Sequence, residues 1–298
     1  KIEFMKFTSF FRRIYSLLRL IKAHPLAKNE KLSALIRYFT FHLRYKNGEE
    51  IAIPFSEGHL IISKGEGSQA HFFTYLEDYE EMVFLLHFLR VNDQFIDVGA
   101  NIGAYSILAA SQIGCKTIAF EPSEKNYSIL QANLHLNNLQ EFIEIHNFAL
   151  GEKNETKTIG TKGALTYITN NQNLDLQKIE IQRLDDFAEY AQIIKIDVEG
   201  FEEFVLKGAE QVLNHPDTHA VILELAGYNR YNSSDAIIHK LMINNHFFPV
   251  QYFPDIREIK KLESFRIDQF NTIYIKNMKL VKERIIESPK YKIGSYWV

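Results

Sequence analysis

The chain has 298 residues, 46 % of them hydrophobic and 24 % charged, which is ordinary for a globular protein with a sizeable core. Its single cysteine, Cys115, excludes an intrachain disulfide and a cysteine-based zinc cluster, and no apolar run reaches the roughly 18 residues of a transmembrane helix. The net charge of −3 divides into +9 for residues 1–47 and −12 for the remainder, which argues against nucleic acid as a partner. Because a chain without disulfides fits a reducing compartment, we expect a cytoplasmic protein.

Residues 1–75 are predicted to form an N-terminal extension. Over residues 7–22, apolar side chains follow helical spacing with arginines and lysines opposite, which indicates a basic amphipathic helix. Such a helix could pack on its own domain, form a dimer face or contact an anionic membrane peripherally. Residues 50–54 and 59–63 alternate as short strands do.

Beyond this extension, strand and helix patterns alternate with little interruption. Helices are predicted over residues 79–90, from Ser123 onward, after residue 200, and over residues 233–244 with Ser233 or Ser234 as the cap. Because continuous apolar strands alternate with helices, we expect a mainly parallel sheet with helices on both faces and an antiparallel C-terminal edge. Residues 151–180 are polar and predict a hairpin insertion. The expected strands cover residues 94–98, 116–121, 142–148, 193–197, 220–225, 248–253 and 272–275.

Residues 95–106 predict a buried strand, a glycine turn and the start of a helix. This arrangement presents backbone N–H groups to a nucleotide-like ligand. Asp97 adds a negative charge that suits a cationic or hydroxyl-rich ligand better than a pyrophosphate. A nicotinamide-dependent dehydrogenase would carry G-x-G-x-x-G, and the run from Gly99 to Gly103 lacks the middle glycine.

Acidic and polar residues stand where the other strands are expected to end. In open α/β sheets, ligands bind at the carboxyl ends of the central strands. Glu121 lies where an acid accepts hydrogen bonds from ribose hydroxyls, and the Asn147 amide could read an adenine edge. Lys195, inside a strand, needs a partner that Asp197 or a ligand could supply. The residues predicted at this edge are Asp97, Gly99, Glu121, Asn147, Asp197, Glu199 and Glu224.

Three segments make the chain similar to class I S-adenosylmethionine-dependent methyltransferases, and specifically to the FkbM family. They are Asp97-Val-Gly-Ala-Asn-Ile-Gly103, Phe120-Glu-Pro122 and Lys195-Ile-Asp-Val-Glu-Gly-Phe-Glu202, the last being the most discriminating. The resemblance implies a Rossmann-like domain over residues 76–298 with a seven-stranded sheet. It also implies S-adenosylmethionine as the methyl donor and O-methylation of a small-molecule hydroxyl, most typically of a sugar, a glycan or a secondary metabolite.

The resemblance also implies roles for individual residues. Gly99, Asn101 and Gly103 would line the methionine end and the ribose of the cofactor, and Asp97 would approach its ammonium. Glu121 would bind the ribose hydroxyls, with Asn147 and Phe148 flanking the adenine. These seven residues are the expected cofactor site.

The candidates for proton removal are Asp197 and Glu199, which follow the fourth strand. Glu224, Tyr228 and Arg230 follow the fifth strand and are candidate acceptor contacts. Asp197, Glu199 and Glu224 could instead hold a divalent cation, which we do not favour, so no metal ligand is assigned. His71 and His146 are further candidate bases.

Two alternatives remain open on the sequence. One is an NAD-dependent oxidoreductase. The other is a non-catalytic Rossmann-like scaffold that binds a partner or a membrane through its N-terminal basic helix. The sequence does not determine the acceptor.

Overall fold

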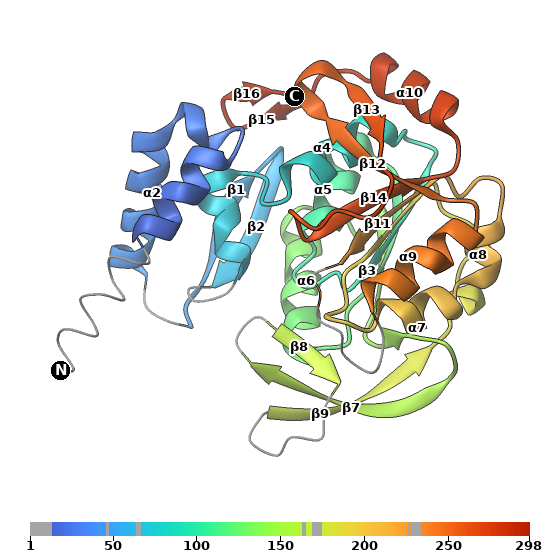
Figure 1. Ribbon diagram of the computed structural model, residues 1–298. Helices are drawn as coiled ribbons and strands as arrows, with labels where there is room; N and C mark the ends of the chain where they lie inside the picture. Colours follow the sequence, from blue (N-terminus) through green and yellow to red (C-terminus); the bar gives the residue numbers. More distant parts are fainter. Residues whose placement is uncertain are drawn as a thin grey trace, which may run out of the picture.

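A computed structural model of the protein describes residues 14–45, 48–63, 67–162, 165–168, 175–225, 227 and 234–298. Its centre is an eight-stranded sheet with strand order β13-β12-β14-β11-β10-β3-β4-β5 (Figure 1). Neighbours from β11 to β5 pair in parallel, while β14, β12 and β13 pair antiparallel. The strands are β3 (Gln94–Val98), β4 (Lys116–Phe120), β5 (Ile143–His146), β10 (Ile193–Ile196), β11 (Ala220–Glu224), β12 (Phe248–Phe253), β13 (Glu258–Lys261) and β14 (Asn271–Ile275).

The predicted fold class is confirmed, but the sheet has eight strands where seven were expected. The additional strand is β13. A 3-10 turn, η5 (Pro254–Ile256), and Arg257 in the left-handed conformation, with φ 52°, reverse the chain so that β13 pairs with β12. Only one of the four β13 residues is buried, so the strand carries too little apolar signal to be recognised from sequence.

Side-chain alternation along the strands divides the interior into two cores, one on each face of the sheet. Phe95 and Ile193 belong to the core under α4, α5, α6 and α10, whereas Ile96 and Ile194 belong to the core under α7, α8 and α9 (Figure 1). The cap predicted for α9 is confirmed, because the Ser234 side chain accepts the N–H of Ile237. The helices are α4 (Tyr79–Phe88), α5 (Ala104–Ile113), α6 (Glu124–Leu136), α7 (Glu202–Lys207), α8 (Glu210–Asn214), α9 (Asp235–Asn244) and α10 (Met278–Glu287).

Two smaller sheets accompany the central one. Residues 151–180 contribute to a four-stranded sheet with order β6-β9-β7-β8, and the chain ends in a short hairpin of β15 and β16. None of the helices in the described part of the chain is long and apolar enough to cross a membrane. The strands are β6 (Ala149–Leu150), β7 (Glu155–Lys162), β8 (Leu165–Ile168), β9 (Asp175–Gln182), β15 (Lys292–Ile293) and β16 (Tyr296–Trp297).

The N-terminal segment consists of a helix over residues 14–23, the longer helix α2 and a β-hairpin. Phe55 and Leu60 of the hairpin are buried in the same apolar core as α4 and the first face of the sheet. The segment therefore shares its interior with the rest of the protein. Its elements are η1 (Ala27–Asn29), α2 (Lys31–Arg44), β1 (Glu50–Phe55), β2 (Gly58–Ser63), η2 (Gly67–Ala70) and α3 (His71–Thr74).

Two asparagines four residues apart, one on α6 and one at its C-cap, hold the hairpin in place. Asn133 is fully buried; its Oδ1 accepts the N–H of Ile61 at 2.6 Å and its Nδ2 donates to the Ile102 carbonyl at 2.8 Å. Asn137 pairs with both backbone groups of His59, each at 2.7 Å. Because Ile102 lies in the glycine loop after β3, Asn133 links the N-terminal hairpin to that loop.

We expect Asn133→Ala to lower the free energy of unfolding by about 2–4 kcal/mol, because it leaves a backbone donor and a buried backbone acceptor without partners. Asn137→Ala is the matched control. Its partner is exposed and can bond to water, so we expect a loss of about 1 kcal/mol or less. Urea unfolding followed by circular dichroism measures both, and equal losses would contradict the structural role given to Asn133.

Candidate active site

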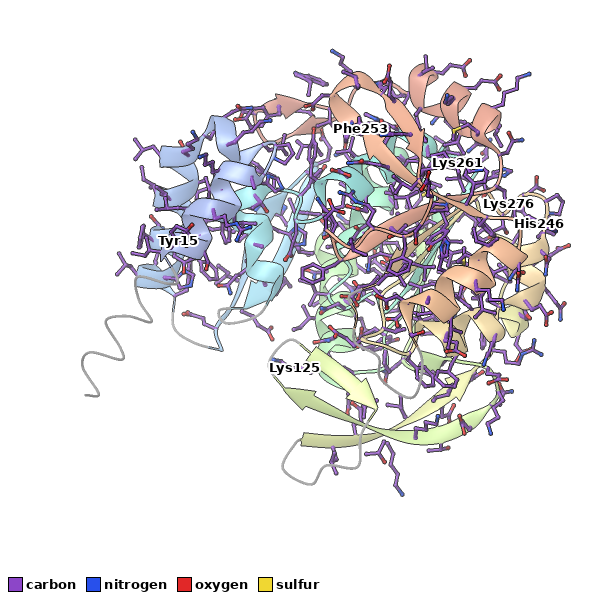
Figure 2. The ribbon with its side chains drawn as sticks, viewed as in Figure 1. Tyr15, Lys125, His246, Phe253, Lys261 and Lys276 are labelled. Atoms are coloured by element: carbon purple, nitrogen blue, oxygen red, sulfur yellow. The ribbon has the colours of Figure 1, made fainter. Side chains whose placement is uncertain are left out.

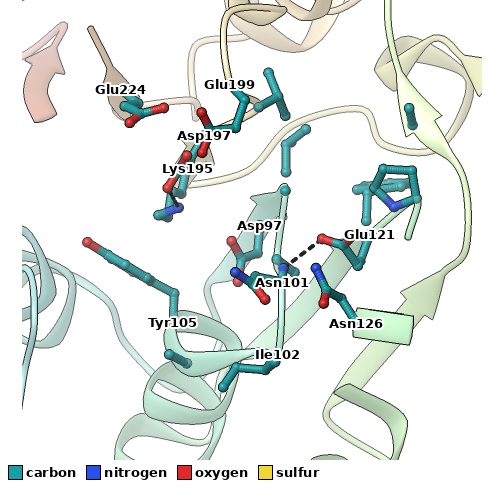
Figure 3. Close-up of a pocket in the computed structure, with 18 of the residues that line it drawn as sticks. Asp97, Asn101, Ile102, Tyr105, Glu121, Asn126, Lys195, Asp197, Glu199 and Glu224 are labelled. Atoms are coloured by element: carbon teal, nitrogen blue, oxygen red, sulfur yellow. Dashed lines mark hydrogen bonds and ion pairs between the residues drawn. The ribbon is translucent and has the colours of Figure 1, made fainter. Parts of the chain in front are cut away.

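A cavity of about 350 Å³ lies at the carboxyl ends of β3, β4, β10 and β11 (Figure 3). This is where an open α/β sheet is expected to bind its ligand. Six of the residues predicted from the strand ends line it together with Asn101. They are Asp97, Gly99, Glu121, Asp197, Glu199 and Glu224.

The glycine loop after β3 is packed tightly against β10. Gly99 has φ 80°, and a Cβ at this position would collide with the carbonyl oxygen of Asp197. Gly103 has φ 90° at the N-terminus of α5, where a Cβ would collide with Leu130. The left-handed backbone favours glycine at both positions, and at Gly99 the neighbouring backbone oxygen also leaves no room for a Cβ. The loop thereby brings the end of β3 against the end of β10.

Glu121 fixes the other side of this loop. The side chain is 4 % exposed; Oε2 accepts the N–H of Asn101 at 2.9 Å and Oε1 accepts the N–H of Ser123 at 2.8 Å (Figure 3). Burial raises the pKa of Glu121 to about 7, and the hydrogen bonds oppose that rise. The carboxyl group thus ties the glycine loop to the start of α6 and faces the cavity beside the loop.

Asn147 and Phe148 follow β5 and are not among the residues that line the cavity. The Asn147 amide donates to the carbonyl of Glu121 at 2.9 Å, so it supports the backbone that carries the carboxyl group. Phe148 packs in an aromatic cluster with Phe120 and Phe187, at ring-centroid distances of 5.5 and 5.0 Å. Their expected contact with adenine stays a prediction.

An ion pair lies on the α4 and α5 face of the sheet, between a buried lysine and a half-buried carboxylate. Lys195 donates to Oδ2 of Asp197 at 2.8 Å, which confirms the predicted partner, and its Nζ lies 4.8 Å from the centroid of the Tyr105 ring. Burial favours the neutral form, but Asp197 and Asp97 outweigh it and raise the pKa of Lys195. Lys195 therefore remains an ammonium, although its side chain is only 5 % exposed.

Asp97 is the neighbouring carboxyl group on β3 and is 1 % exposed. Its Oδ2 accepts the Ser106 hydroxyl at 2.6 Å. Its Oδ1 is buried and has no hydrogen-bond partner among the described residues. Burial raises the pKa of Asp97, and Lys195 opposes that rise. A buried carboxylate oxygen without a partner is suited to a cationic group of a ligand.

Asp197, Glu199 and Glu224 bring carboxyl oxygens within 4.8 Å of one another, a spacing that could hold a divalent cation. Burial and the nearby Asp197 carboxylate raise the pKa of Glu224. Burial acts in the same direction on Asp197, but Lys195 outweighs it and lowers the pKa. The two pKa values are therefore shifted in opposite directions, that of Glu224 toward the protonated form and that of Asp197 toward the ionised form.

The loop that carries Glu199 is held by a buried carboxyl group. Glu199 has φ 54°, a left-handed conformation that is costly for a residue with a side chain. Oε1 of Glu202 accepts the N–H groups of Val198 at 3.2 Å and Gly200 at 3.0 Å, which stabilises this conformation. Glu202 belongs to the segment that resembles the FkbM family, but its structural role was not predicted.

The sequence also failed to indicate that the N-terminal segment completes the cavity. His71, Glu77 and Asp78 all line it, and the Tyr105 hydroxyl donates to Oδ2 of Asp78 at 3.0 Å. These residues precede the first sheet strand, so no strand-end rule applies to them. The available signals were His71, named from the sequence as a candidate base, and Asp78, an acid at the start of a predicted helix.

The remaining candidates differ in their placement. Burial lowers the pKa of His71 to about 4, so this imidazole is neutral. His146 stacks on Phe120 at 5.0 Å and is not among the residues that line the cavity. Tyr228 and Arg230 lie outside the described residues.

The doubly wound sheet, the glycine loop and the acidic strand ends define the class of Rossmann-like methyltransferases. The sequence matches the family described as Methyltransferase FkbM domain over residues 97–270, more than half of the chain. The chain therefore belongs to the FkbM methyltransferase family, as its motifs predicted, and its enzyme class is S-adenosylmethionine-dependent methyltransferase.

Similar solved structures are distant. A methyltransferase FkbM from Methylobacillus flagellatus KT has 18 % identity and a TM-score of 0.40 over 69 % of this chain, and the match spans 52 % of that protein. TYW2 from P. horikoshii has 13 % identity and a TM-score of 0.44, with 83 % of each chain covered. TYW2 from M. jannaschii, in complex with AdoMet, has 14 % identity and a TM-score of 0.42 over 78 % of this chain and 87 % of that chain. No curated protein matches.

We expect Gly99→Ala to weaken binding of S-adenosylmethionine at least tenfold, because the new Cβ would force the glycine loop away from Asp197. Gly114→Ala is the matched control, since Gly114 has a similar φ of 76° but no atom within 3.4 Å of a new Cβ. Both variants should lose roughly 1 kcal/mol of stability from the backbone alone. Calorimetric titration measures binding, and equal affinity in both variants would contradict this role of the loop.

The buried carboxyl group of Glu202 should make the free energy of unfolding depend on pH. Burial raises its pKa from 4.5 to about 7, so between these values the folded protein binds more protons than the unfolded chain. The free energy of unfolding of the ligand-free protein should therefore fall as pH rises from 4.5 to 7, with Glu202 contributing on the order of 1–3 kcal/mol.

Glu202→Gln keeps an oxygen that can accept both N–H groups and removes the titration. The variant should lose this part of the pH dependence, as measured by urea unfolding at pH 5 and pH 7.5. An unchanged pH profile would show that Glu202 is already ionised in the folded protein at the lower pH.

Proposed function

We propose that the protein transfers a methyl group from S-adenosylmethionine to a hydroxyl of a sugar, a glycan or a secondary metabolite. The observation that carries the proposal is the contact between Gly99 and the backbone of Asp197. It brings the expected seat of the methyl donor and the carboxyl groups that could act on an acceptor into one cavity.

The residues of the cavity fit the cofactor. When bound, S-adenosylmethionine supplies a methyl group on a sulfonium, which is a good leaving group. The partnerless oxygen of Asp97 is suited to the cofactor's ammonium, and Glu121 to hydroxyls of the ribose. The carboxyl group of Asp97 also disfavours a pyrophosphate, which argues against the oxidoreductase alternative.

The charge of the cavity supports a neutral acceptor with several hydroxyls. Among the described residues, five acids line the cavity beyond Asp97 and Glu121, against one ammonium, that of Lys195. Carboxyl groups exchange hydrogen bonds with hydroxyls whether they are protonated or ionised, and the ionised Asp197 repels phosphates and carboxylates, so a polyol fits better than an anionic metabolite or nucleic acid. The five acids are Glu77, Asp78, Asp197, Glu199 and Glu224.

Asp197 is the proposed base. Lys195 keeps it ionised, so one carboxylate oxygen can accept the acceptor's hydroxyl proton while the other bonds to the ammonium. Glu199 and Glu224 would orient the acceptor oxygen toward the methyl group. The same three carboxyl groups could bind a divalent cation, which would acidify the hydroxyl. The proposal requires no metal ion, because the Lys195 ammonium already places a positive charge beside Asp197.

We expect Asp197→Asn to lower kcat by on the order of 10²–10⁴, because the amide cannot accept the proton. Binding of S-adenosylmethionine should change less than threefold. Glu199→Gln should lower kcat less. Asp217→Asn is the control, since this acid is 58 % exposed and does not line the cavity.

The assay is transfer of a tritiated methyl group to neutral polyols, glycans and anionic metabolites, with calorimetric titration of S-adenosylmethionine and NAD alongside. Full activity of Asp197→Asn would remove it as the base. Binding of NAD alone would overturn the proposed function. Cofactor binding without transfer to any acceptor would favour the non-catalytic scaffold.

A further inference from the structure

The N-terminal helix α2 has two apolar faces, and the described residues of the chain cover only one of them. Ala34 and Phe41 are buried, and Ala34 packs with Leu17 and Ile21 of the helix over residues 14–23. The other face carries four apolar side chains at spacings of four, three and four residues, which places them in one stripe. They are Leu32, Ile36, Phe39 and Leu43, exposed by 72, 56, 39 and 87 %.

This stripe differs from the surface predicted from sequence. The sequence indicated a basic amphipathic helix over residues 7–22, of which residues 7–13 lie outside the described part of the chain. In the helix over residues 14–23, Leu17 and Ile21 are buried at 6 and 1 % exposure. The continuous exposed stripe belongs to α2.

The segment that carries the stripe is basic. Residues 14–45 contain six arginines and lysines and one acid, Glu30, which gives a net charge of +5. Arg37 pairs with Glu30 at 3.1 Å. The other five cations are exposed and form no ion pair with an acid in the described residues. They are Arg19, Lys22, Lys28, Lys31 and Arg44.

We propose that this exposed face of α2 binds the surface of an anionic lipid bilayer. Apolar side chains flanked by exposed cations match the two components of such a surface, the acyl boundary and the negative headgroups. A second copy of the chain would bring the same +5 charge against it, which disfavours a symmetric dimer. A nucleic acid would leave the four apolar side chains without a matching partner.

The placement of the helix agrees with this role. α2 lies at the outer side of the molecule, away from α7–α9, and Tyr15 marks the N-terminal helices at the opposite side from Lys276 and His246 (Figures 1 and 2). Arg37 donates to the carbonyl of Phe73 at 3.2 Å, in the short helix whose first residue, His71, lines the cavity. Binding of α2 to a bilayer would therefore set the orientation of the cavity with respect to the membrane surface.

The test is sedimentation of the full chain with vesicles of phosphatidylcholine alone or with about 30 % phosphatidylglycerol. The double variant Leu32→Asp/Leu43→Asp removes the ends of the stripe. Its matched control is Val91→Asp/Ile267→Asp, which makes the same charge change at side chains exposed by 64 and 91 % elsewhere. Melting temperature and cofactor affinity, measured for both, report on folding independently.

We expect the wild type to bind the anionic vesicles at least tenfold more strongly than the neutral ones, with affinity falling as salt rises. The α2 variant should lose at least tenfold in affinity, and the control less than threefold. Absence of wild-type binding, equal binding to both vesicles, or equal losses in the two variants would overturn the proposal. So would a dimer in ultracentrifugation that the α2 variant alone dissociates.

Discussion

The buried ammonium of Lys195 is the charge on which the acidic cavity depends. It bonds to Asp197 at 2.8 Å and acts on the pKa values of Asp97 and Asp78 as well. Carboxyl groups gathered in a buried site repel one another and tend to take up protons. One cation in the centre of the group keeps Asp197 ionised. It is also held in place by the Tyr105 ring, so the charge needed by the proposed base is part of the packed core.

The N-terminal segment is a structural part of the cavity. It shares an apolar core with the sheet, and Asn133 connects its hairpin to the glycine loop through Ile102. Its last helix supplies His71 to the wall of the cavity, and Glu77 and Asp78 follow that helix directly. A change in this segment can therefore reach the cofactor site through hydrogen bonds to backbone groups, without contacting the cofactor.

Acidic and basic residues gather at separate places in the structure. Acids collect at the strand ends, where they face a small cavity and, in the proposed function, contact a neutral, hydroxyl-rich acceptor. Exposed bases collect around α2, on an outer surface that also carries an apolar stripe. The proposed catalytic site and the proposed membrane surface thus use side chains of opposite charge at separate places in the fold.

The sequence by itself determined the sheet, the glycine loop, the family and most of the strand-end acids. It could do so because buried parallel strands are continuous apolar runs, and because Asp97, Glu121 and Asp197 directly follow or end such runs. The partner of Lys195 could also be predicted, since a lysine inside a buried strand requires a counter-charge two residues away or across the sheet.

Only the tertiary structure decided which distant segments meet. Asp78 reaches Tyr105, and Asn133 reaches Ile61 and Ile102, through contacts that no local pattern encodes. The edge strand β13 has one buried residue and therefore no readable periodicity. Helical spacing indicates that a helix has an apolar face, but the fold determines whether that face is covered. For α2, packing against residues 14–23 covers one face and leaves the stripe from Leu32 to Leu43 exposed.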